Sequence, residues 1–316
     1  MLPDLRIAKY RFTLRALEET RLPRHKGSTL RGGFGYAFKR TVCFQKRAKS
    51  CAHCLLKAHC PYAYIFETPP PPGAEAFAVS EAPHPFVVEP PLGGQTLYRP
   101  GELLPFNLVL VGRGINYLPY FIVAFRELGR MGLGKDRGKF RLQAVEAVHP
   151  LTGERAPVYS AEDEMVQDSD LGVGCREVEE AAHELPQGRL RLRFLTPTRL
   201  KFRGRYVSRP DFPILLRSLL RRISWLCYFH GGGRWEADYG ALLERAQEVE
   251  TALMDIRWVE WERYSTKQRQ RMTLGGFVGE VEYRGELAPF RPMVLLGSLV
   301  HVGKLCVFGH GWYQIL

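Results

Sequence analysis

The alternation of apolar and polar residues predicts a β-strand near the start of the chain. Over residues 7–17 an extended chain carries apolar side chains on one face and polar ones on the other, with Tyr10, Phe12 and Leu14 opposite Arg11, Thr13 and Arg15. This period of two is typical of a half-buried strand. Ser28 or Thr29 could then cap a helix that buries Leu30, Phe34, Ala37 and Phe38. The glycines inside this helix cost roughly 1 kcal/mol each, so close packing must compensate.

One order of elements occurs twice in the chain. A helix that starts at Pro119 leads into a loop rich in glycine and lysine, residues 129–140, and then into a strand over 141–148. Near the carboxyl end, a strand over 276–284 and a helix from Pro289 precede the glycine-rich loop 303–311 and a short strand over 312–315. The second series is typical of the latter half of a split βαβ unit. Together the two series predict an architectural repeat in an α+β protein.

Periodicity also predicts the elements between these two series. Strands are predicted over 86–88, 104–111 and 190–195, and a helix over 212–229 that ends at three consecutive glycines. Residues 235–259 look helical, and 258–264 look like a strand. The acidic segment 150–187 lacks periodicity, and we interpret it as a solvated linker or insertion.

Length and composition set the class of protein. The chain has 316 residues, of which 45% are hydrophobic, so it can bury a core and is long enough for two domains. No run approaches the ~18 consecutive apolar residues of a membrane-spanning helix. The first residues lack the apolar core of a signal peptide. We therefore expect a cytoplasmic protein with no membrane partner.

The charge of the chain is concentrated in blocks. Residues 1–60 contain 14 Lys and Arg against 3 Asp and Glu, and residues 187–225 contain 11 against Asp211 alone. Residues 161–186 are acidic, with 9 Asp and Glu against one Arg, within a net charge of +12. Two basic blocks indicate a polyanionic partner, either a nucleic acid or a membrane surface. Aromatic residues and glycines interspersed with the charges favour a nucleic acid.

Four of the seven cysteines lie close together in the sequence, at Cys43, Cys51, Cys54 and Cys60. In a reducing compartment this spacing favours a metal site over disulfides. Four thiolates suit a tetrahedral zinc ion, which would leave no open position and so have a structural role. An iron–sulfur cluster uses the same ligands, and His53 or His59 could replace one cysteine.

The loop 303–311 is a second candidate for ligand binding. Its glycines would let backbone N–H groups approach an anion, and Lys304 adds a positive charge beside them. A plain turn between a helix and a strand would explain the same glycines.

Several motifs, in this order, resemble the carboxy-terminal half of one family. They are Thr196-Pro197-Thr198-Arg199-Leu200-Lys201, then Gly279-Glu280-Val281-Glu282-Tyr283-Arg284-Gly285, then His301-Val302-Gly303-Lys304 with Phe308-Gly309-His310-Gly311. The family is that of the CRISPR repeat endoribonucleases, the Cas-six family of the RAMP superfamily. The resemblance covers the carboxy-terminal part of the chain well and the amino-terminal part more loosely. It implies two tandem ferredoxin-like (RRM-like) domains, at 1–150 and 188–316. A metal-binding insertion at 43–60 would lie in the first, and the acidic segment 151–187 would join the two.

The resemblance also implies an activity. Family members cleave CRISPR precursor transcripts within the repeat, without a metal, and leave a 2′,3′-cyclic phosphate. This chemistry needs a base, an acid and cations that stabilise the phosphorane. In many members a histidine follows the first strand, and His25 matches that place. Its neighbours Arg24 and Lys26 would lower its pKa. Tyr36, Lys39 and Lys46 are alternatives, because some members use tyrosine and lysine from the first helix.

RNA would bind through the basic helix faces and both glycine-rich loops. The predicted contacts are Arg24, Lys26, Arg31, Lys135, Arg137, Arg199, Lys201, Arg203, Arg217, Arg221, Gly303, Lys304, Gly309, His310 and Gly311. The expected partners are CRISPR repeat RNA, other Cas proteins of an interference complex and, in a homodimer, a second copy. Two alternatives stay open. One is a non-catalytic RAMP subunit that holds guide RNA, and the other is a zinc-containing DNA-binding regulator.

Overall fold

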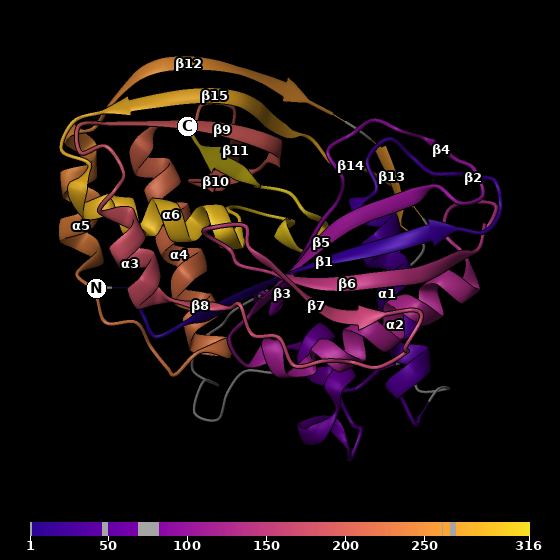
Figure 1. Ribbon diagram of the computed structural model, residues 1–316. Coiled ribbons are helices and arrows are strands. Elements are labelled where there is room, and N and C mark those ends of the chain that lie inside the picture. The colour runs from indigo at the N-terminus through magenta and orange to yellow at the C-terminus, as the bar shows by residue number, and fades with distance from the viewer. Residues whose placement is uncertain (1, 46–49, 69–81, 261, 266–269) are drawn as a thin grey trace. The chain divides into compact units, whose positions relative to one another are not determined.

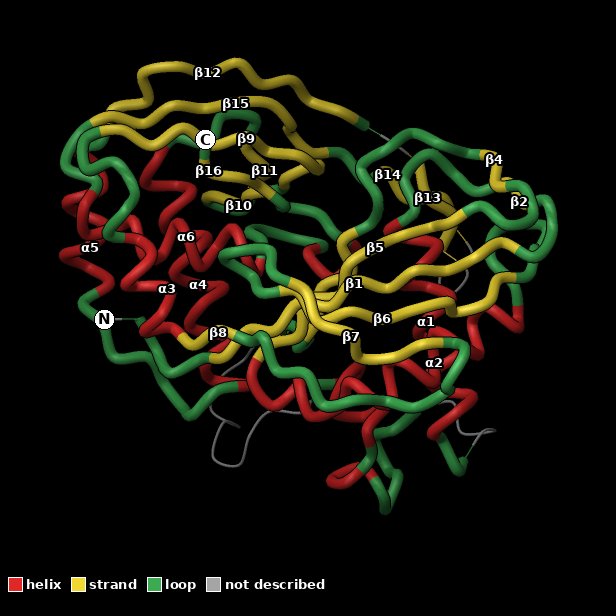
Figure 2. Tube along the Cα trace, viewed as in Figure 1, coloured by secondary structure: helices red, strands yellow, loops and turns green. Residues whose placement is uncertain are grey.

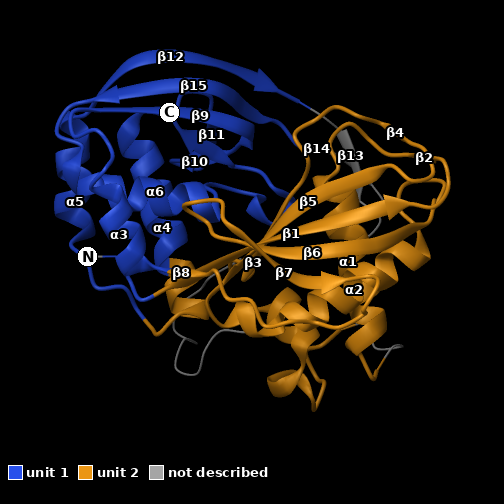
Figure 3. Ribbon diagram, viewed as in Figure 1, with its two compact units in different colours: residues 1–4, 174–224, 234–316 blue, residues 5–173, 225–233 orange. Residues whose placement is uncertain are grey.

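Two antiparallel sheets with the same strand order organise the chain (Figure 1). The computed structural model describes residues 2–45, 50–68, 82–260, 262–265 and 270–316. Unit 1 consists of residues 1–4, 174–224 and 234–316, and unit 2 of residues 5–173 and 225–233 (Figure 3). The chain therefore passes between the units several times, and helix α4 (Phe212–His230) contributes to both.

In unit 2 the strand order is β3-β5-β1-β6-β7. The central strand β1 (Arg6–Ala16) pairs with β5 (Leu103–Val111) and β6 (Phe140–Val148), and β3 (Phe86–Glu89) and β7 (Arg155–Ser160) lie outside them. Strand β8 (Val173–Gly174) also pairs with β1, and β2 (Thr20–Arg21) pairs with β4 (Leu97–Tyr98). Helices α1 (Gly27–Val42) and α2 (Leu118–Met131) cover one face of this sheet (Figure 2).

The core of unit 2 is largely aromatic. The ring of Phe34 on α1 stacks on Phe125 of α2, with centroids 4.7 Å apart, and Phe125 contacts Phe12 of β1 at 5.0 Å. Phe12 points inward because β1 alternates as predicted. A Cβ added at Gly33 would lie 2.6 Å from Leu128 Cδ1, so α1 and α2 approach each other closely at this glycine. This packing supplies the compensation that the glycines of α1 need.

In unit 1 the strand order is β12-β15-β9-β16. These strands are β12 (Glu250–Val259), β15 (Gly276–Arg284), β9 (Arg189–Thr198) and β16 (Tyr313–Ile315). Helices α3 (Cys175–Ala182), α5 (Tyr239–Arg245) and α6 (Arg291–Val300) accompany α4. Two hairpins complete the unit, β10 (Leu200–Phe202) with β11 (Arg205–Val207) and β13 (Glu262–Ser265) with β14 (Gln270–Thr273).

When the strands of β3-β5-β1-β6 and of β12-β15-β9-β16 are counted in chain order, the first strand of each set lies between the third and the fourth. Strand β1 lies between β5 and β6, and β9 lies between β15 and β16. With a helix after the first and the third strand, this is the ferredoxin-like order. The prediction of two such folds in tandem is confirmed.

Three local predictions differ from the structure. Helix α1 begins at Gly27 with Lys26 at the N-cap and no side-chain cap, so Ser28 and Thr29 do not cap it. The predicted helix over 235–259 is short α5 followed by strand β12, because pairing with β15 overrides the helical propensity of that segment. The acidic segment 151–187 contains β7, β8 and α3, and it buries Val158, Val173 and Val178.

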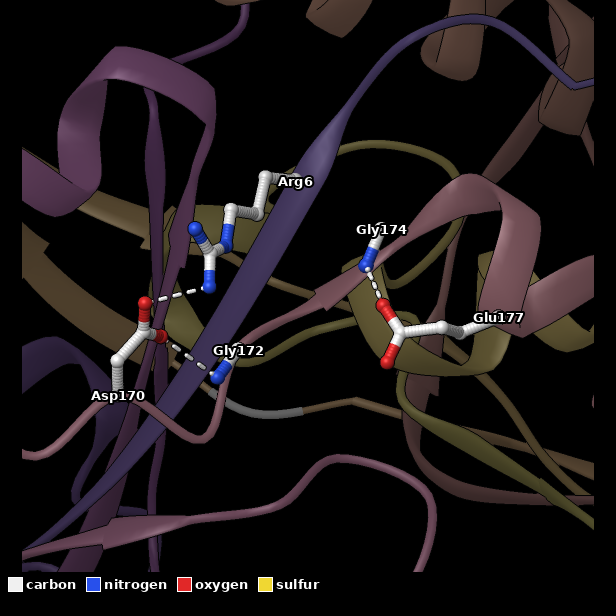
Figure 4. Close-up of polar contacts among 5 residues, drawn as sticks. All are labelled: Arg6, Asp170, Gly172, Gly174 and Glu177. Carbon is white, nitrogen blue, oxygen red and sulfur yellow. Dashed lines mark hydrogen bonds and ion pairs between the residues drawn. The ribbon is translucent and has the colours of Figure 1, made fainter.

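Short polar contacts fix the end of the acidic segment (Figure 4). In unit 2, Asp170 accepts a bond of 2.5 Å from Arg6 Nη2 and one of 3.0 Å from the Gly172 N–H. In unit 1, Glu177 Oε2 accepts a bond of 2.7 Å from the Gly174 N–H at the start of α3. The ion pair of Arg6 and Asp170 is about half exposed, so it contributes little stability. The three contacts nonetheless fix the path of the backbone at the end of the acidic segment.

The last residues of α4 form part of unit 2. His230 is fully buried, and its Nδ1 lies 3.0 Å from the hydroxyl of Tyr64. Its Nε2 lies 2.7 Å from the carbonyl oxygen of Pro83. Both ring nitrogens therefore bind groups from other parts of unit 2.

Among the described residues, no helix has both the length and the apolar composition of a membrane span.

Candidate active site and RNA-binding surfaces

His25 lies on the exposed loop between β2 and α1 in unit 2. Partial desolvation of its ring lowers its pKa from the usual value, and the neighbouring charges of Arg24 and Lys26 lower it further. The imidazole is therefore neutral at neutral pH, which is the form that accepts a proton. The exposure of His25 and its lowered pKa are therefore compatible with a role as general base.

Lys26 holds this loop in place. Its side chain is fully buried, and its Nζ donates to the carbonyl oxygens of Gln95 at 2.6 Å and Arg24 at 3.3 Å. The amine also lies over the ring of Tyr98, 5.7 Å from its centroid. Burial lowers the pKa of Lys26. The prediction that Lys26 contacts RNA is therefore corrected to a structural role, because this amine binds backbone inside the fold.

The predicted glycine- and lysine-rich loop 129–140 lies beside the His25 loop. A Cβ at Gly134 would lie 2.8 Å from the carbonyl oxygen of Arg21, so the two segments touch. The carbonyl of Lys139 also accepts the N–H of Leu17 at 2.9 Å. The exposed side chains of this pair of loops include those of Arg24, His25, Lys135 and Arg137, together with Pro23, Arg130 and Asp136. The structure thus brings four predicted site residues to one end of unit 2.

The alternative catalytic residues lie elsewhere. Tyr36 is 64% exposed on α1, but it lies nine residues beyond the start of the helix at Gly27. At 1.5 Å per residue this is about 14 Å along the helix axis from Gly27, so Tyr36 lies on a different part of α1 from the end that follows His25. Lys39 lies further on, with its Nζ over the ring of Tyr62 at 5.5 Å. Lys46 is outside the described residues.

Arg31, a predicted RNA contact, packs within unit 2. Its guanidinium lies over the ring of Phe66, 4.9 Å from the centroid, and 5.9 Å from that of Phe86. The side chain is half-buried. Cation–π contacts of this kind stabilise the position of the arginine in the fold. We therefore place Arg31 with the structural residues.

The glycine-rich loop 303–311 in unit 1 is bound by the protein's own backbone. The N–H groups of Lys304 and Gly311 donate to the carbonyl oxygens of Arg199 at 3.0 Å and Pro197 at 3.1 Å. The Gly309 N–H donates to Cys306 at 2.7 Å. These three N–H groups are therefore not available to an anion, and the predicted anion contacts at Gly309 and Gly311 are corrected.

The histidines within this loop and just before it are also buried in the fold. His310 and His301 are buried, and His301 Nδ1 lies 2.9 Å from the carbonyl oxygen of His310. His301 stacks on Trp312 with ring centroids 5.8 Å apart. Because His310 is buried, the prediction that its side chain contacts RNA is corrected. Lys304 is only half-buried, so its side chain stays accessible from the loop.

The hairpin of β10 and β11 presents the clearest cationic surface of unit 1. Its exposed residues include the predicted contacts Lys201 and Arg203, together with Arg205 and Tyr206, which were not predicted. Arg203 at φ 46° and Gly204 at φ 83° form the tight turn between the strands. This hairpin was not predicted from the sequence, and the signal that indicates it is the alternation of aromatic and basic residues around an Arg-Gly pair.

Arg199 supports the same hairpin. Its guanidinium lies 4.7 Å from the ring centroid of Tyr206, and its Nε donates to the carbonyl of Gly275. Tyr206 remains 49% exposed, so its ring can still receive a base. On α4, Arg217 and Arg221 are exposed as predicted, whereas Arg222 Nε binds the carbonyl oxygen of Val300 at 2.8 Å.

The four cysteines of the predicted zinc site lie in unit 2. The pKa of the Cys51 thiol is raised, first by desolvation and then by the charge of Glu67, with smaller effects from Cys60 and Cys43. Cys43, Cys51 and Cys60 are therefore close enough to affect one another. Within the part of the chain that the structure describes, however, no group of three or more His, Cys, Asp or Glu side chains is arranged to hold a metal ion. Zinc binding therefore stays a prediction from the cysteine spacing, and no step below depends on a metal.

Two family models match successive parts of the chain. The AF_1859_N family, described as an N-terminal domain, matches residues 5–171, which is more than half of the chain. The family described as CRISPR-associated endoribonuclease Cas6 matches residues 192–313. An uncharacterized protein of Archaeoglobus fulgidus is 25% identical over 298 residues, which are 93% of this chain and 92% of the relative.

Solved structures share the fold over the whole chain. A Cas6 product complex is 19% identical with a TM-score of 0.58, covering 98% of this chain and 100% of the other. Thermus thermophilus Cas6 is 17% identical with a TM-score of 0.57, covering 99% of both chains. A partial Cas6-RT-Cas1–Cas2 complex is 16% identical with a TM-score of 0.57, covering 100% of this chain and 46% of the other. Through the match over residues 5–171 the chain belongs to the AF_1859_N family, and its residues 192–313, which hold the motifs, match the CRISPR-associated endoribonuclease Cas6 family.

Proposed function

We propose that this protein cleaves CRISPR precursor transcripts within the repeat and so produces guide RNAs. The observation that carries the proposal is the exposed His25, whose pKa is lowered, on a loop beside the cations Lys135 and Arg137. The match of residues 192–313 to the Cas6 family suggests the class of reaction, and the side chains offer a base and cations in one unit.

His25 acts as the base in this proposal. Its neutral imidazole takes the proton of a 2′-hydroxyl, and the 2′-oxygen forms a bond to the adjacent phosphorus. The bond from phosphorus to the 5′-oxygen breaks, and a proton from water completes the 5′-hydroxyl product. The other product carries a 2′,3′-cyclic phosphate. Arg24, Lys135 and Arg137 would stabilise the negative charge that develops on the phosphorane.

RNA binding would use the cationic surfaces of both units. In unit 1 the hairpin of β10 and β11 offers Lys201, Arg203 and Arg205 for phosphates, and Tyr206 for a base. Arg217 and Arg221 extend the exposed positive charge on α4. The partial Cas6-RT-Cas1–Cas2 complex is named for other Cas proteins. By analogy we propose that this chain also works beside Cas proteins.

The test is a cleavage assay on the host's repeat RNA in the presence of EDTA. We expect a single cut with a cyclic phosphate end, detected by mass spectrometry, and no cut when the scissile nucleotide lacks its 2′-hydroxyl. His25→Ala should lower the rate about 10²–10⁴-fold, as expected for loss of a general base, with repeat binding retained. His183→Ala, at an exposed histidine in unit 1, is the matched control and should cleave normally.

Two outcomes would redirect the assignment. If wild-type protein binds the repeat but does not cut it, the protein is a non-catalytic subunit that holds guide RNA. If His25→Ala cuts at the normal rate, the catalytic role moves to Tyr36 or Lys39 on α1.

A further inference from the structure

Lys26 is a buried lysine whose position is unfavourable for the stability of the fold. Its side chain is fully buried, and the acceptors that the described residues provide are the neutral carbonyl oxygens of Gln95 and Arg24. Removing an ammonium group from water is costly, and it is compensated best by an opposite charge. Lys26 also occupies the N-cap of α1, where the helix dipole disfavours a positive charge. An apolar side chain of similar length would therefore suit this position better if stability were the only requirement.

The acceptor Gln95 belongs to a segment, residues 94–98, that runs alongside the loop of His25. The carbonyl oxygen of Thr96 in this segment accepts the N–H of Leu22 at 2.8 Å. The segment also contains β4, which pairs with β2 just before the loop. Two backbone connections therefore hold the start of the loop against segment 94–98, and the Lys26 amine adds a third connection at the end of the loop.

The residue that binds the Lys26 amine is itself held in place. Gln95 donates through Nε2 to the carbonyl oxygen of Leu97 at 3.0 Å and to Oε2 of Glu102 at 3.1 Å. The same carboxylate oxygen accepts the N–H of Arg99 at 2.9 Å. The carbonyl oxygen of Gln95 is thus a fixed point to which a neighbouring loop can be attached.

We propose that Lys26 is a positioning residue for RNA cleavage, which holds the imidazole of His25 by joining its loop to segment 94–98. This inference rests on the proposed function. The amine binds the carbonyl of Arg24, the residue before His25, while its own backbone follows His25 directly. Both sides of His25 are therefore tied to one ammonium group. A displacement of about 1 Å at a catalytic group can lower a rate about 10²-fold, so this attachment has a function that an apolar side chain cannot supply.

The ammonium group also acts on the imidazole through its charge. Desolvation is the largest cause of the lowered pKa of His25, followed by the charges of Arg24 and Lys26. Removing the Lys26 charge should therefore raise the pKa of His25. Other charged residues of the segments packed against this loop include Lys135, Asp136, Arg137, Arg99 and Glu102.

The test is Lys26→Met, which keeps an unbranched side chain but removes the charge and the donors. We expect a midpoint of urea denaturation no lower than that of wild type. The kcat for repeat RNA should fall about 10²-fold, with KM within about twofold, because binding of the RNA is not affected. In the RNA-free protein, NMR titration should show a higher pKa for His25, and the Leu22 N–H should exchange faster with solvent.

Lys9→Met is the matched control. Lys9 lies on β1 in the same unit, and its Nζ binds the buried carboxylate of Glu89 at 2.7 Å. Losing this lysine leaves a buried carboxylate without its ammonium partner, so the variant should be less stable than wild type. Its kcat and the pKa of His25 should be unchanged, because Lys9 does not bind the His25 loop. The two lysines thus separate a loss of stability from a loss of positioning.

The proposal is overturned if Lys26→Met cuts at the wild-type rate. It is also overturned if circular dichroism shows that this variant is unfolded, since the lysine would then be required for the fold itself. An unchanged pKa of His25 together with unchanged exchange of the Leu22 N–H would equally exclude a positioning role. If wild type does not cut the repeat, the proposed function fails, whereas the titration and the exchange still decide whether Lys26 fixes His25.

Discussion

Gly311→Ala tests whether the loop 303–311 is held by the protein's own backbone. Gly311 has a φ of 70°, which costs an alanine about 1 kcal/mol. A Cβ there would lie 1.8 Å from the carbonyl oxygen of Val302, whereas real Cβ contacts essentially never fall below 3.0 Å. The backbone must therefore move by more than 1 Å. That movement breaks the bonds from the Val302 N–H to Gly311 and from the Gly311 N–H to Pro197. Each loss costs about 1 kcal/mol, so we expect about 3 kcal/mol of destabilisation in total.

Gly204→Ala is the matched control for this experiment. Gly204 has a φ of 83°, but a Cβ there meets nothing within 4 Å, so only the left-handed conformation is penalised. We expect about 1 kcal/mol for this variant. Urea denaturation followed by tryptophan fluorescence measures both free energies of unfolding, and Trp312, which stacks on His301, lies close to the altered loop. Equal values for the two variants would refute the structural role of the loop.

Three further predictions concern catalysis, RNA and metal. Arg24→Gln removes one of the charges that lower the pKa of His25, so the acidic limb of the pH–rate profile should move to higher pH under single-turnover conditions; an unmoved limb would contradict His25 as the base. Replacing Lys201, Arg203 or Arg205 by Gln should reduce the salt dependence of RNA binding by about 0.7 in the log–log slope per contact. The control Arg176→Gln, with a 92% exposed side chain, should change nothing. The cysteine spacing predicts one zinc ion per chain, measured by elemental analysis, and Cys54→Ser should abolish zinc binding. Iron together with visible absorption would indicate an iron–sulfur cluster. A folded protein that contains no metal would contradict the predicted metal site.

Local pattern was enough to predict most of the fold. The strands at β1 and β15 and the helices α2 and α6 follow from periodicity and from proline at the first turn, which are properties of contiguous residues. Strand β12 was assigned to a helix because its residues have fair helical propensity, and only pairing with β15 decides otherwise. Sequence reasoning at one position cannot supply a partner that lies tens of residues away.

The candidate site was predictable in part, for a similar reason. His25 was proposed from the family resemblance and the loop of Lys135 and Arg137 from its glycines and charge, and the structure places these two loops side by side. The burial of Lys26 was missed, because a lysine is normally exposed and the carbonyl of Gln95 that binds it is distant in sequence. The glycines of 303–311 were interpreted as an anion site, but the N–H groups of Gly309 and Gly311 have protein partners that only the folded chain reveals.

The shared helix α4 restricts how this protein can be divided. A cut after residue 173 follows the apparent boundary between the family matches. It would nevertheless remove residues 225–233 from unit 2, and with them His230, leaving Tyr64 and Pro83 without their buried imidazole. Recombination between two related genes at that boundary would combine Tyr64 from one relative with the end of α4 from another. The amino-terminal half is thus a structural domain that the carboxy-terminal half completes, and the two have to be inherited together.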